Sequence, residues 1–192
     1  MWSDDMLAIR NKLIRIAKNE LDQHATIIVF PESVAGSSRR PQVELWKEVS
    51  LSAKSKGAVV LVGEEAWNTR KTGFYNALVG FGDVPVQGQV IAAAQVPMPV
   101  GDWKFGLEEG AISHIFGKDV ISLAGKFVAV SMCYEDFILW PHRGLLSGKA
   151  DVLISAANQW PSRGTSAETA QDLSRKLLGR LAGVPMLIAK NH

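Results

Sequence analysis

The sequence predicts an α/β protein, in which buried strands alternate with helices along the chain. Short runs of β-branched and aliphatic residues recur without polar alternation, which is typical of strands that are buried on both faces. Between several of these runs, apolar residues recur every three or four positions, as on one face of a helix. A length of 192 residues fits one domain, so a single domain over residues 1–192 is expected.

The residue ranges of the expected helices and strands follow from these patterns. A helix over residues 4–24 has apolar residues at helical spacing, and Ser3 or Asp4 can cap it. A strand over residues 26–30 follows and ends at Pro31. The other expected helices cover residues 41–56, 141–148 and 166–182, and the other expected strands cover residues 58–63, 74–81, 90–96, 126–132, 151–157 and 185–189. The longest irregular segment, residues 97–117, is long enough to suggest a functional loop.

The composition argues against several classes of partner and compartment. Lysine plus arginine is 21 and aspartate plus glutamate is 19, so the net charge of +2, with no basic block, predicts no binding to nucleic acid. No apolar run approaches the ~18 residues of a membrane span. The acidic start of the chain does not resemble a signal peptide. One cysteine cannot form an internal disulfide, and we expect this chain to be soluble.

Two reactive side chains follow predicted strands, at the edge of the sheet where ligands of α/β proteins collect. Glu32 comes after the strand over residues 26–30, and Cys133 comes after the strand over residues 126–132. Separately, each has an ordinary explanation, a loop carboxylate and a buried thiol. Together they suggest a nucleophile and its base, because the thiolate is the reactive form. His142 is an alternative base. No metal cluster or dinucleotide fingerprint is visible, so no metal and no cofactor is expected.

Three motifs resemble landmarks of the nitrilase, or carbon–nitrogen hydrolase, superfamily. They are Phe-Pro-Glu-Ser at residues 30–33, Tyr-Asn-Ala-Leu at residues 75–78 and Met-Cys-Tyr-Glu-Asp at residues 132–136, in the order of the family. Cys-Tyr-Glu, with the loop over residues 96–102, most resembles the apolipoprotein N-acyltransferase branch and its plasmid relatives, the TraB-type conjugal transfer proteins. The resemblance covers residues 6–190 and implies a nitrilase-like α-β-β-α sandwich.

The resemblance also implies a mechanism. Glu32 takes the thiol proton, and Cys133 attacks an amide or acyl donor and forms a thioester, as in a thiol hydrolase or N-acyltransferase linked to plasmid conjugal transfer. A lysine stabilises the oxyanion in this family, as developing negative charge requires. Glu135 orients that lysine or positions the acceptor, although a carboxylate at a helix start is an equal alternative. The expected substrate-binding residues are Tyr134, Asp102, Asn158 and Trp160.

The sequence departs from the family at the lysine. Placing the family's loop pattern on residues 94–102 without gaps puts Ala94 at that position and Asp102 at the loop glutamate. Lys104 is the nearest alternative cation. The second hypothesis is therefore an impaired member that serves as a binding or assembly module. The third is a different cysteine hydrolase that uses His142 as its base.

The ends of the chain also differ from the family. A strand usually precedes the first helix of this fold, and further strands follow the last one, so we expect a domain that is truncated at both ends. The expected substrate is a small molecule or lipid with an acyl or amide group. A homodimer is expected as one alternative. The resemblance implies a bacterial protein, either cytoplasmic or a periplasmic domain of a parent with membrane helices.

Overall fold

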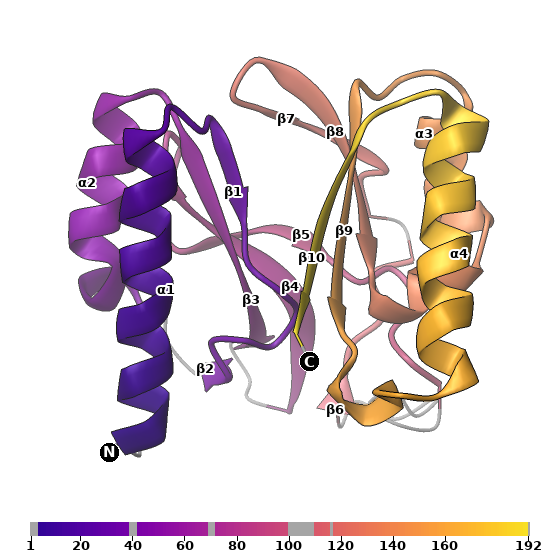
Figure 1. The fold of residues 1–192 in the computed structure, drawn as a ribbon, viewed down its shortest axis with the longest axis horizontal. Helices are drawn as coiled ribbons and strands as arrows, with labels where there is room; N and C mark the ends of the chain where they lie inside the picture. Colours follow the sequence, from indigo (N-terminus) through magenta and orange to yellow (C-terminus); the bar gives the residue numbers. More distant parts are fainter. Residues whose placement is uncertain (1–3, 39–41, 69–71, 100–109, 116, 192) are drawn as a thin grey trace.

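The computed structural model describes residues 4–38, 42–68, 72–99, 110–115 and 117–191, and it contains two sheets that face each other between two layers of helices (Figure 1). The helices outside the first sheet are α1 (Asp4–Asp22) and α2 (Lys47–Ser55). Those outside the second sheet are α3 (Arg143–Leu146) and α4 (Ser166–Ala182). The α-β-β-α sandwich that the resemblance implies is thus confirmed.

The first sheet is mixed, with the strand order β1-β3-β4-β5. Its strands are β1 (Ile27–Val29), β3 (Val59–Trp67), β4 (Gly73–Gly82) and β5 (Gln89–Ala93). Strand β1 runs parallel to β3, whereas β4 is antiparallel to both β3 and β5. Two short strands extend it, β2 (Ser37–Ser38) beside β3 and β6 (Gly110–Ala111) beside β4. The carboxyl ends of β1 and β3 therefore lie at the same edge.

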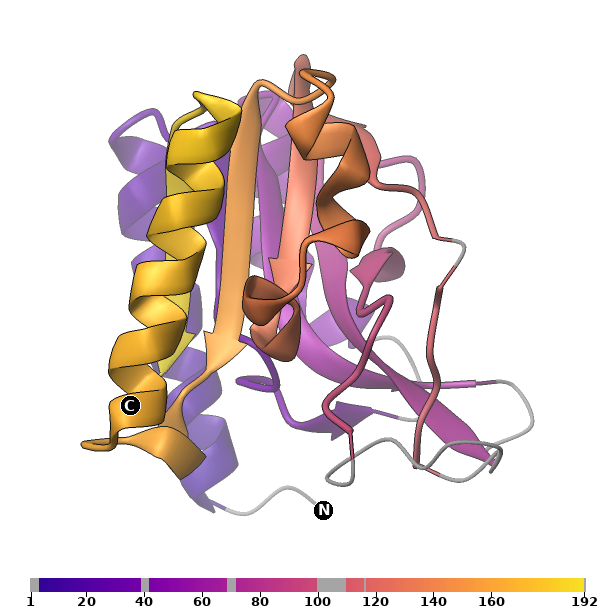
Figure 2. The same cartoon turned by 90° about the vertical axis from the view of Figure 1, so that its right-hand side faces the viewer.

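The second sheet has the strand order β10-β9-β8-β7. Its strands are β7 (Val120–Leu123), β8 (Lys126–Met132), β9 (Val152–Asn158) and β10 (Met186–Asn191). Strands β8, β9 and β10 are parallel, and β7 is antiparallel to β8. Helices α3 and α4 pack over its outer face (Figure 2). The described part of the chain also forms four 3₁₀ helices: η1 (Val43–Trp46), η2 (Cys133–Phe137), η3 (Trp140–His142) and η4 (Trp160–Ser162).

The core consists of layers, because each sheet buries both of its faces. Val60 and Val62 of β3 pack against the helices, with Trp46, which stacks on Phe81 at 5.5 Å. The alternate residue of β3, Leu61, packs between the sheets with residues of β8 and β9. This double burial explains why the strand sequences are apolar without alternation.

Several predicted boundaries differ from the structure. Strand β7 was not predicted, because four residues are too few to show a pattern. The expected helix over residues 41–56 starts as a 3₁₀ turn and becomes α-helical only at Lys47. The expected strand over residues 90–96 ends at Ala93, since the N–H groups of Gln95 and Val96 donate to the Glu135 carboxylate rather than to a neighbouring strand.

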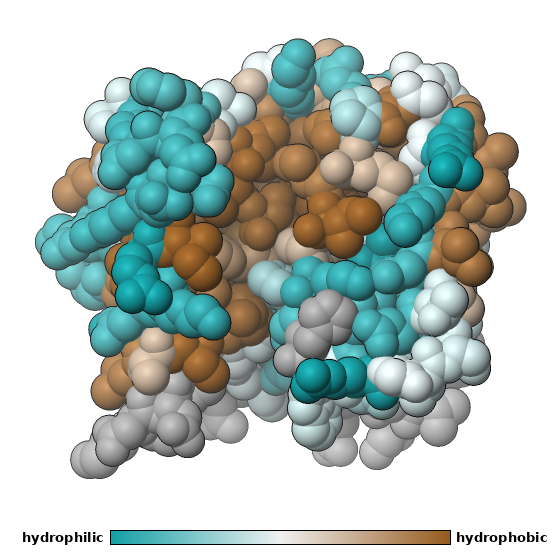
Figure 3. Space-filling view, viewed as in Figure 1, coloured by the Kyte–Doolittle hydropathy of each residue, from teal (hydrophilic) through white to brown (hydrophobic). Residues whose placement is uncertain are grey.

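The surface between the two helix layers is largely apolar on the face that Figure 1 presents (Figure 3). There β1 and β10, the edge strands of the two sheets, lie side by side. Leu187 and Ile188 of β10 are among the exposed apolar side chains. No helix within the described residues combines the length and the apolarity that crossing a membrane requires.

Candidate active site

Glu32 is buried where the chain leaves β1, and its carboxylate connects the two sheets. Its side chain is 4% exposed. Oε2 accepts a hydrogen bond of 2.7 Å from the backbone N–H of Asn158 at the end of β9, and Oε1 accepts one from the side-chain amide of Asn76 in β4. A buried carboxylate is stable only when such donors replace water. Glu32, which the sequence places at the end of a strand, is therefore held in the site by donors from both sheets.

Gly63 of β3 allows the Glu32 segment to approach the sheet. A Cβ at this position would lie 2.7 Å from Glu32 Cα and would overlap the carbonyl oxygen of Pro31. The segment is held there by a hydrogen bond of 3.0 Å from the Ala35 N–H to the Gly63 carbonyl oxygen. Sequence reasoning missed this role. The available signal was a glycine that ends a buried apolar run.

Cys133 begins η2 directly after β8, with its backbone in the left-handed region at φ +46°. Few residues other than glycine adopt this conformation, and it costs of the order of 1–3 kcal/mol. In this conformation the Cys133 thiol lies next to Glu32 and donates a hydrogen bond to its carboxylate. The Asn158 N–H donates to the Cys133 sulfur. The predicted nucleophile and the predicted base are in contact.

The surroundings of Cys133 favour the protonated thiol. Burial and the negative charge of Glu32 raise the pKa of the Cys133 thiol far above its usual range, against the smaller lowering effect of the Asn158 N–H. A free thiolate is therefore scarce at neutral pH. Such a thiol reacts when its proton passes to the adjacent carboxylate as the new bond forms.

Glu135 faces backbone groups rather than the thiol. Its Oε1 accepts hydrogen bonds of 2.5 Å from the Gln95 N–H and 3.0 Å from the Val96 N–H, and its Oε2 accepts one of 2.9 Å from the Met132 N–H. Burial raises the pKa of Glu135 to about 7, and the three N–H donors oppose this rise. The carboxylate clamps the segment after β5 to the end of β8, next to Cys133.

A pocket of about 250 Å³ opens at Cys133. Its walls include the expected residues Tyr134 and Asn158. The apolar side chains of Met98, Phe137, Pro161 and Ala167 also line it, as do the polar residues Ser162 and Gln171. Trp160 is 71% exposed, and its neighbours Pro161 and Ser162 line the pocket instead. Asp102 and Lys104 lie outside the described residues.

Ala94, at the expected lysine position, is buried beside the site. Its side chain is 1% exposed and packs between the sheets. Its N–H donates to the Asn76 carbonyl oxygen at 2.8 Å, and the Asn76 side chain binds Glu32. A methyl group at this position supplies no charge for an oxyanion.

His142 lies behind Glu135. Its side chain is 1% exposed, and Nε2 is 3.0 Å from the Glu135 carbonyl oxygen. Burial lowers the pKa of His142, so the ring is neutral at neutral pH. Glu32, not His142, is the basic group that contacts the thiol.

Three further polar residues belong to the site and were not assigned a role from the sequence. Asn76 lies in the Tyr-Asn-Ala-Leu motif and binds Glu32. Asp136 is part of η2, and Gln171 of α4 packs against it: the Gln171 side-chain amide donates to the Cys133 carbonyl oxygen and to Asp136. No signal pointed to Gln171, because one polar residue in an amphipathic helix is ordinary. Within the described ranges, no three His, Cys, Asp or Glu side chains form a group that could hold a metal ion.

Two curated proteins are similar to this chain over most of its length. A "Conjugal transfer protein TraB" from Agrobacterium fabrum is 28% identical over 195 residues, which covers 98% of this chain and 44% of that protein. A "Probable conjugal transfer protein TraB" from Sinorhizobium fredii is 25% identical over 184 residues, which covers 93% of this chain and 46% of that protein. The chain therefore spans about half the length of these relatives. No protein-family model matches it.

Solved structures share the fold at low sequence identity. A carbon-nitrogen hydrolase from Helicobacter pylori has a TM-score of 0.65 at 16% identity, with 94% of this chain and 68% of that chain covered. A mutant Nesterenkonia amidase from the nitrilase superfamily has a TM-score of 0.63 at 12% identity, with 96% and 70% covered. A glutamine-dependent NAD⁺ synthetase from Acinetobacter baumannii has a TM-score of 0.65 at 14% identity, with 97% and 35% covered. The resemblance drawn from the three motifs is confirmed.

Proposed function

We propose that this chain, which has the nitrilase-superfamily fold and is similar to TraB conjugal transfer proteins, is a thiol hydrolase or N-acyltransferase that works through a thioester on Cys133. The main observation in support of this proposal is that the Cys133 thiol contacts the Glu32 carboxylate and the Asn158 N–H. A protonated thiol beside a hydrogen-bonded carboxylate is the arrangement that general-base activation needs.

The proposed reaction has two stages. In the first, the thiol proton passes to Glu32 while the sulfur of Cys133 bonds to the acyl carbon. The leaving amine or alcohol takes the proton back from Glu32, and a thioester remains. In the second stage Glu32 removes a proton from water or an acceptor amine, which attacks the thioester and restores the thiol. Glu135 supports this site by fixing the segments on either side of it.

The walls of the pocket favour an apolar acyl group. Met98, Phe137 and Ala167 offer no charge, whereas Asn158 can position a polar group near the sulfur. The names of the two relatives connect the proposed activity with conjugal transfer, and their sources support a bacterial origin. The compartment stays a prediction.

The test uses the single cysteine of the chain, so that any thiol adduct is on residue 133. Purified protein is mixed with p-nitrophenyl esters of two to ten acyl carbons, and the intact mass is measured. We expect an acyl adduct that Cys133→Ala abolishes and Glu32→Gln slows by about 10²-fold or more. Tyr75→Phe, away from the thiol, is the control for general damage. The proposal is refuted if the wild-type protein forms no acyl adduct and its thiol also does not react with iodoacetamide.

A second function, an impaired member that binds or assembles without turnover, is favoured by Ala94. The methyl group of Ala94 cannot stabilise an oxyanion. Ala94→Lys separates the two functions. Turnover of the esters that appears only in this variant supports the impaired member, whereas comparable turnover in the wild type excludes it. Ala93→Lys, on the neighbouring position of β5, is the control.

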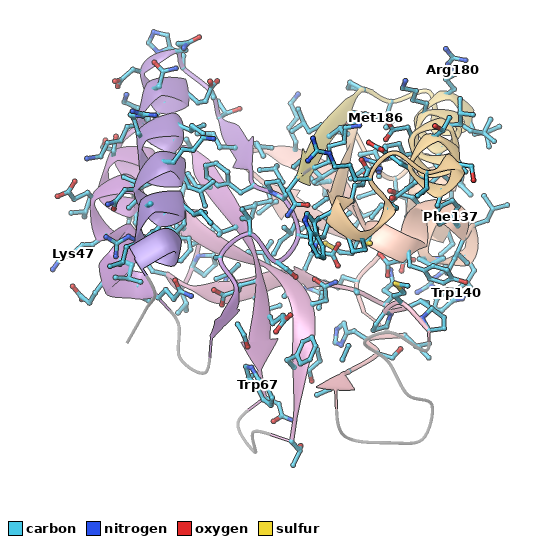
Figure 4. All side chains as sticks on the ribbon, turned by 60° about the horizontal axis from the view of Figure 1, so that its bottom comes forward. Lys47, Trp67, Phe137, Trp140, Arg180 and Met186 are labelled. Atoms are coloured by element: carbon cyan, nitrogen blue, oxygen red, sulfur yellow. The ribbon has the colours of Figure 1, made fainter. Side chains whose placement is uncertain are left out.

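A second copy of the chain is the proposed partner of the outer face of α4. Leu173, Leu177 and Leu181 recur every four residues there and are 63%, 55% and 61% exposed. Phe137 and Trp140 also point outward on this side of the molecule (Figure 4). An apolar stripe of this kind is typical of a helix that packs against another helix.

A further inference from the structure

Gln171 of α4 contacts both polypeptide segments that form the catalytic pair. Its Nε2 donates to the Cys133 carbonyl oxygen at 2.9 Å and to Asp136 Oδ2 at 3.0 Å. Its Oε1 accepts a hydrogen bond of 3.2 Å from Gln159 Nε2. Gln171 is 5% exposed and Gln159 is fully buried, so water competes little for these bonds.

These contacts reach the segments that fix the Cys133 thiol and the Glu32 carboxylate, whose relative position decides whether a proton can pass between them. The Cys133 carbonyl belongs to the residue with the left-handed backbone. Gln159 directly follows Asn158, whose N–H binds Glu32. One side chain on α4 therefore connects the segment that carries the thiol with the segment that holds the carboxylate.

Asp136 keeps the Gln171 amide in place. Its carboxylate accepts hydrogen bonds from Ser131 Oγ at 2.6 Å and from Ser155 Oγ at 3.0 Å, on the adjacent strands β8 and β9. It also forms an ion pair of 3.3 Å with Arg175, which is one turn after Gln171 and is fully buried. The amide of Gln171 thus binds a carboxylate that both strands and the helix fix.

We infer that Gln171 is a positioning residue that holds the Cys133 thiol against the Glu32 carboxylate. The inference rests on the proposed function, since it concerns the same pair. Without the amide, the strained backbone of Cys133 loses a bond that keeps it left-handed, and it relaxes toward an ordinary conformation. The thiol then leaves Glu32, and proton transfer between them fails.

A double-mutant cycle on the full chain tests this inference. The probe is iodoacetamide, which alkylates the thiol. The sulfur of Cys133 bonds to the methylene carbon of the probe, iodide leaves, and the thiol proton passes to Glu32. The rate is measured for the wild type, Glu32→Gln, Gln171→Met and the double variant. In the wild type we expect Glu32→Gln to slow alkylation at least about tenfold. With Gln171→Met present, the same change should alter the rate less than about twofold.

Leu178→Ala is the control, because Leu178 is a buried residue of the same helix that packs in the core and not against Cys133. It should destabilise the protein and leave the tenfold effect of Glu32→Gln intact. Gln171→Asn, which is too short to reach both partners, replaces Gln171→Met if the latter does not fold. Two results overturn the inference alone. In one, Glu32→Gln slows alkylation as much in the Gln171→Met background as in the wild type; in the other, this slowing is lost to the same extent in the Leu178→Ala background. A wild-type rate that ignores Glu32→Gln overturns the proposed function itself.

Discussion

At the scale of single residues, the site depends on atoms that the motifs do not mention. Glu32 and Cys133 are the proposed reactive pair, but their contact requires a glycine at position 63 and a left-handed backbone at position 133. Both are backbone requirements, and side-chain chemistry does not reveal them. Substitutions at such positions change the geometry of the pair without removing either reactive group.

Gly63→Ala should displace Glu32 and destabilise the fold. The added methyl group has no space, because backbone atoms of Pro31 and Glu32 occupy it. We expect a loss of about 2 kcal/mol or more in unfolding free energy, with Cys133 alkylation reduced to the level of Glu32→Gln. Urea unfolding and iodoacetamide kinetics measure the two effects. Gly57→Ala is the control: it has a positive φ but open space, so it should cost only about 1 kcal/mol and spare the reactivity.

Glu64 should make the stability depend on pH. Burial raises the pKa of this carboxyl in β3 to about 7, from its ordinary value of 4.5. Between these values the folded state holds a proton that the unfolded state has released, so stability falls as pH rises from about 4.5 to about 7. Glu64→Gln should reduce this fall by up to about 3 kcal/mol, measured by urea unfolding at pH 5 and pH 8. The same fall in Glu64→Gln as in the wild type contradicts the prediction; exposed Glu44→Gln is the control.

At the scale of elements, the 3₁₀ helix η2 is the structure that joins reactivity to packing. It starts with Cys133, the proposed nucleophile, and carries Glu135 and Asp136, both about 1% exposed. Glu135 connects it to the segment after β5, and Asp136 connects it to β8, β9 and α4. These five residues thus connect the second sheet and its helix with the segment after β5.

Arg175→Met should test the connection between η2 and α4. The change leaves Asp136 with its hydroxyl and amide donors but without its cation, in a site with no access to water. Removing one partner of a buried ion pair costs about 3–5 kcal/mol. Urea unfolding measures the loss, and exposed Arg180→Met on the same helix should change the stability by less than about 0.5 kcal/mol. Equal effects of the two variants would contradict this role.

At the scale of the whole molecule, the two sheets form the site together. Glu32 comes from the first sheet, Cys133 from the second, and the Asn158 N–H between them contacts both. The outer face of α4, by contrast, takes no part in this site and is the surface that we assign to a second copy. The two features can therefore be tested independently.

Leu177→Lys should abolish self-association without changing Cys133 reactivity. A charge in the centre of the leucine stripe has to be desolvated when two copies pack. Analytical ultracentrifugation over a concentration series should show a dimer for the wild type and a monomer for the variant. The control is Leu51→Lys on α2, a leucine outside the other sheet that is 63% exposed, against 55% for Leu177, and this variant should remain dimeric. A wild type that is monomeric at all concentrations excludes the dimer.

The amino-acid pattern by itself predicted the α/β class, most strands and the two residues, Glu32 and Cys133, that the structure brings into contact, because buried strands and their exits leave local signals. It could not determine that Glu135 clamps backbone groups or that Gln171 of α4 binds the Cys133 carbonyl oxygen. Those contacts join residues 38 to 40 positions apart, and only the packing of the two sheets and α4 brings them together. The tertiary structure decided the site because its donors belong to segments whose sequences are ordinary on their own.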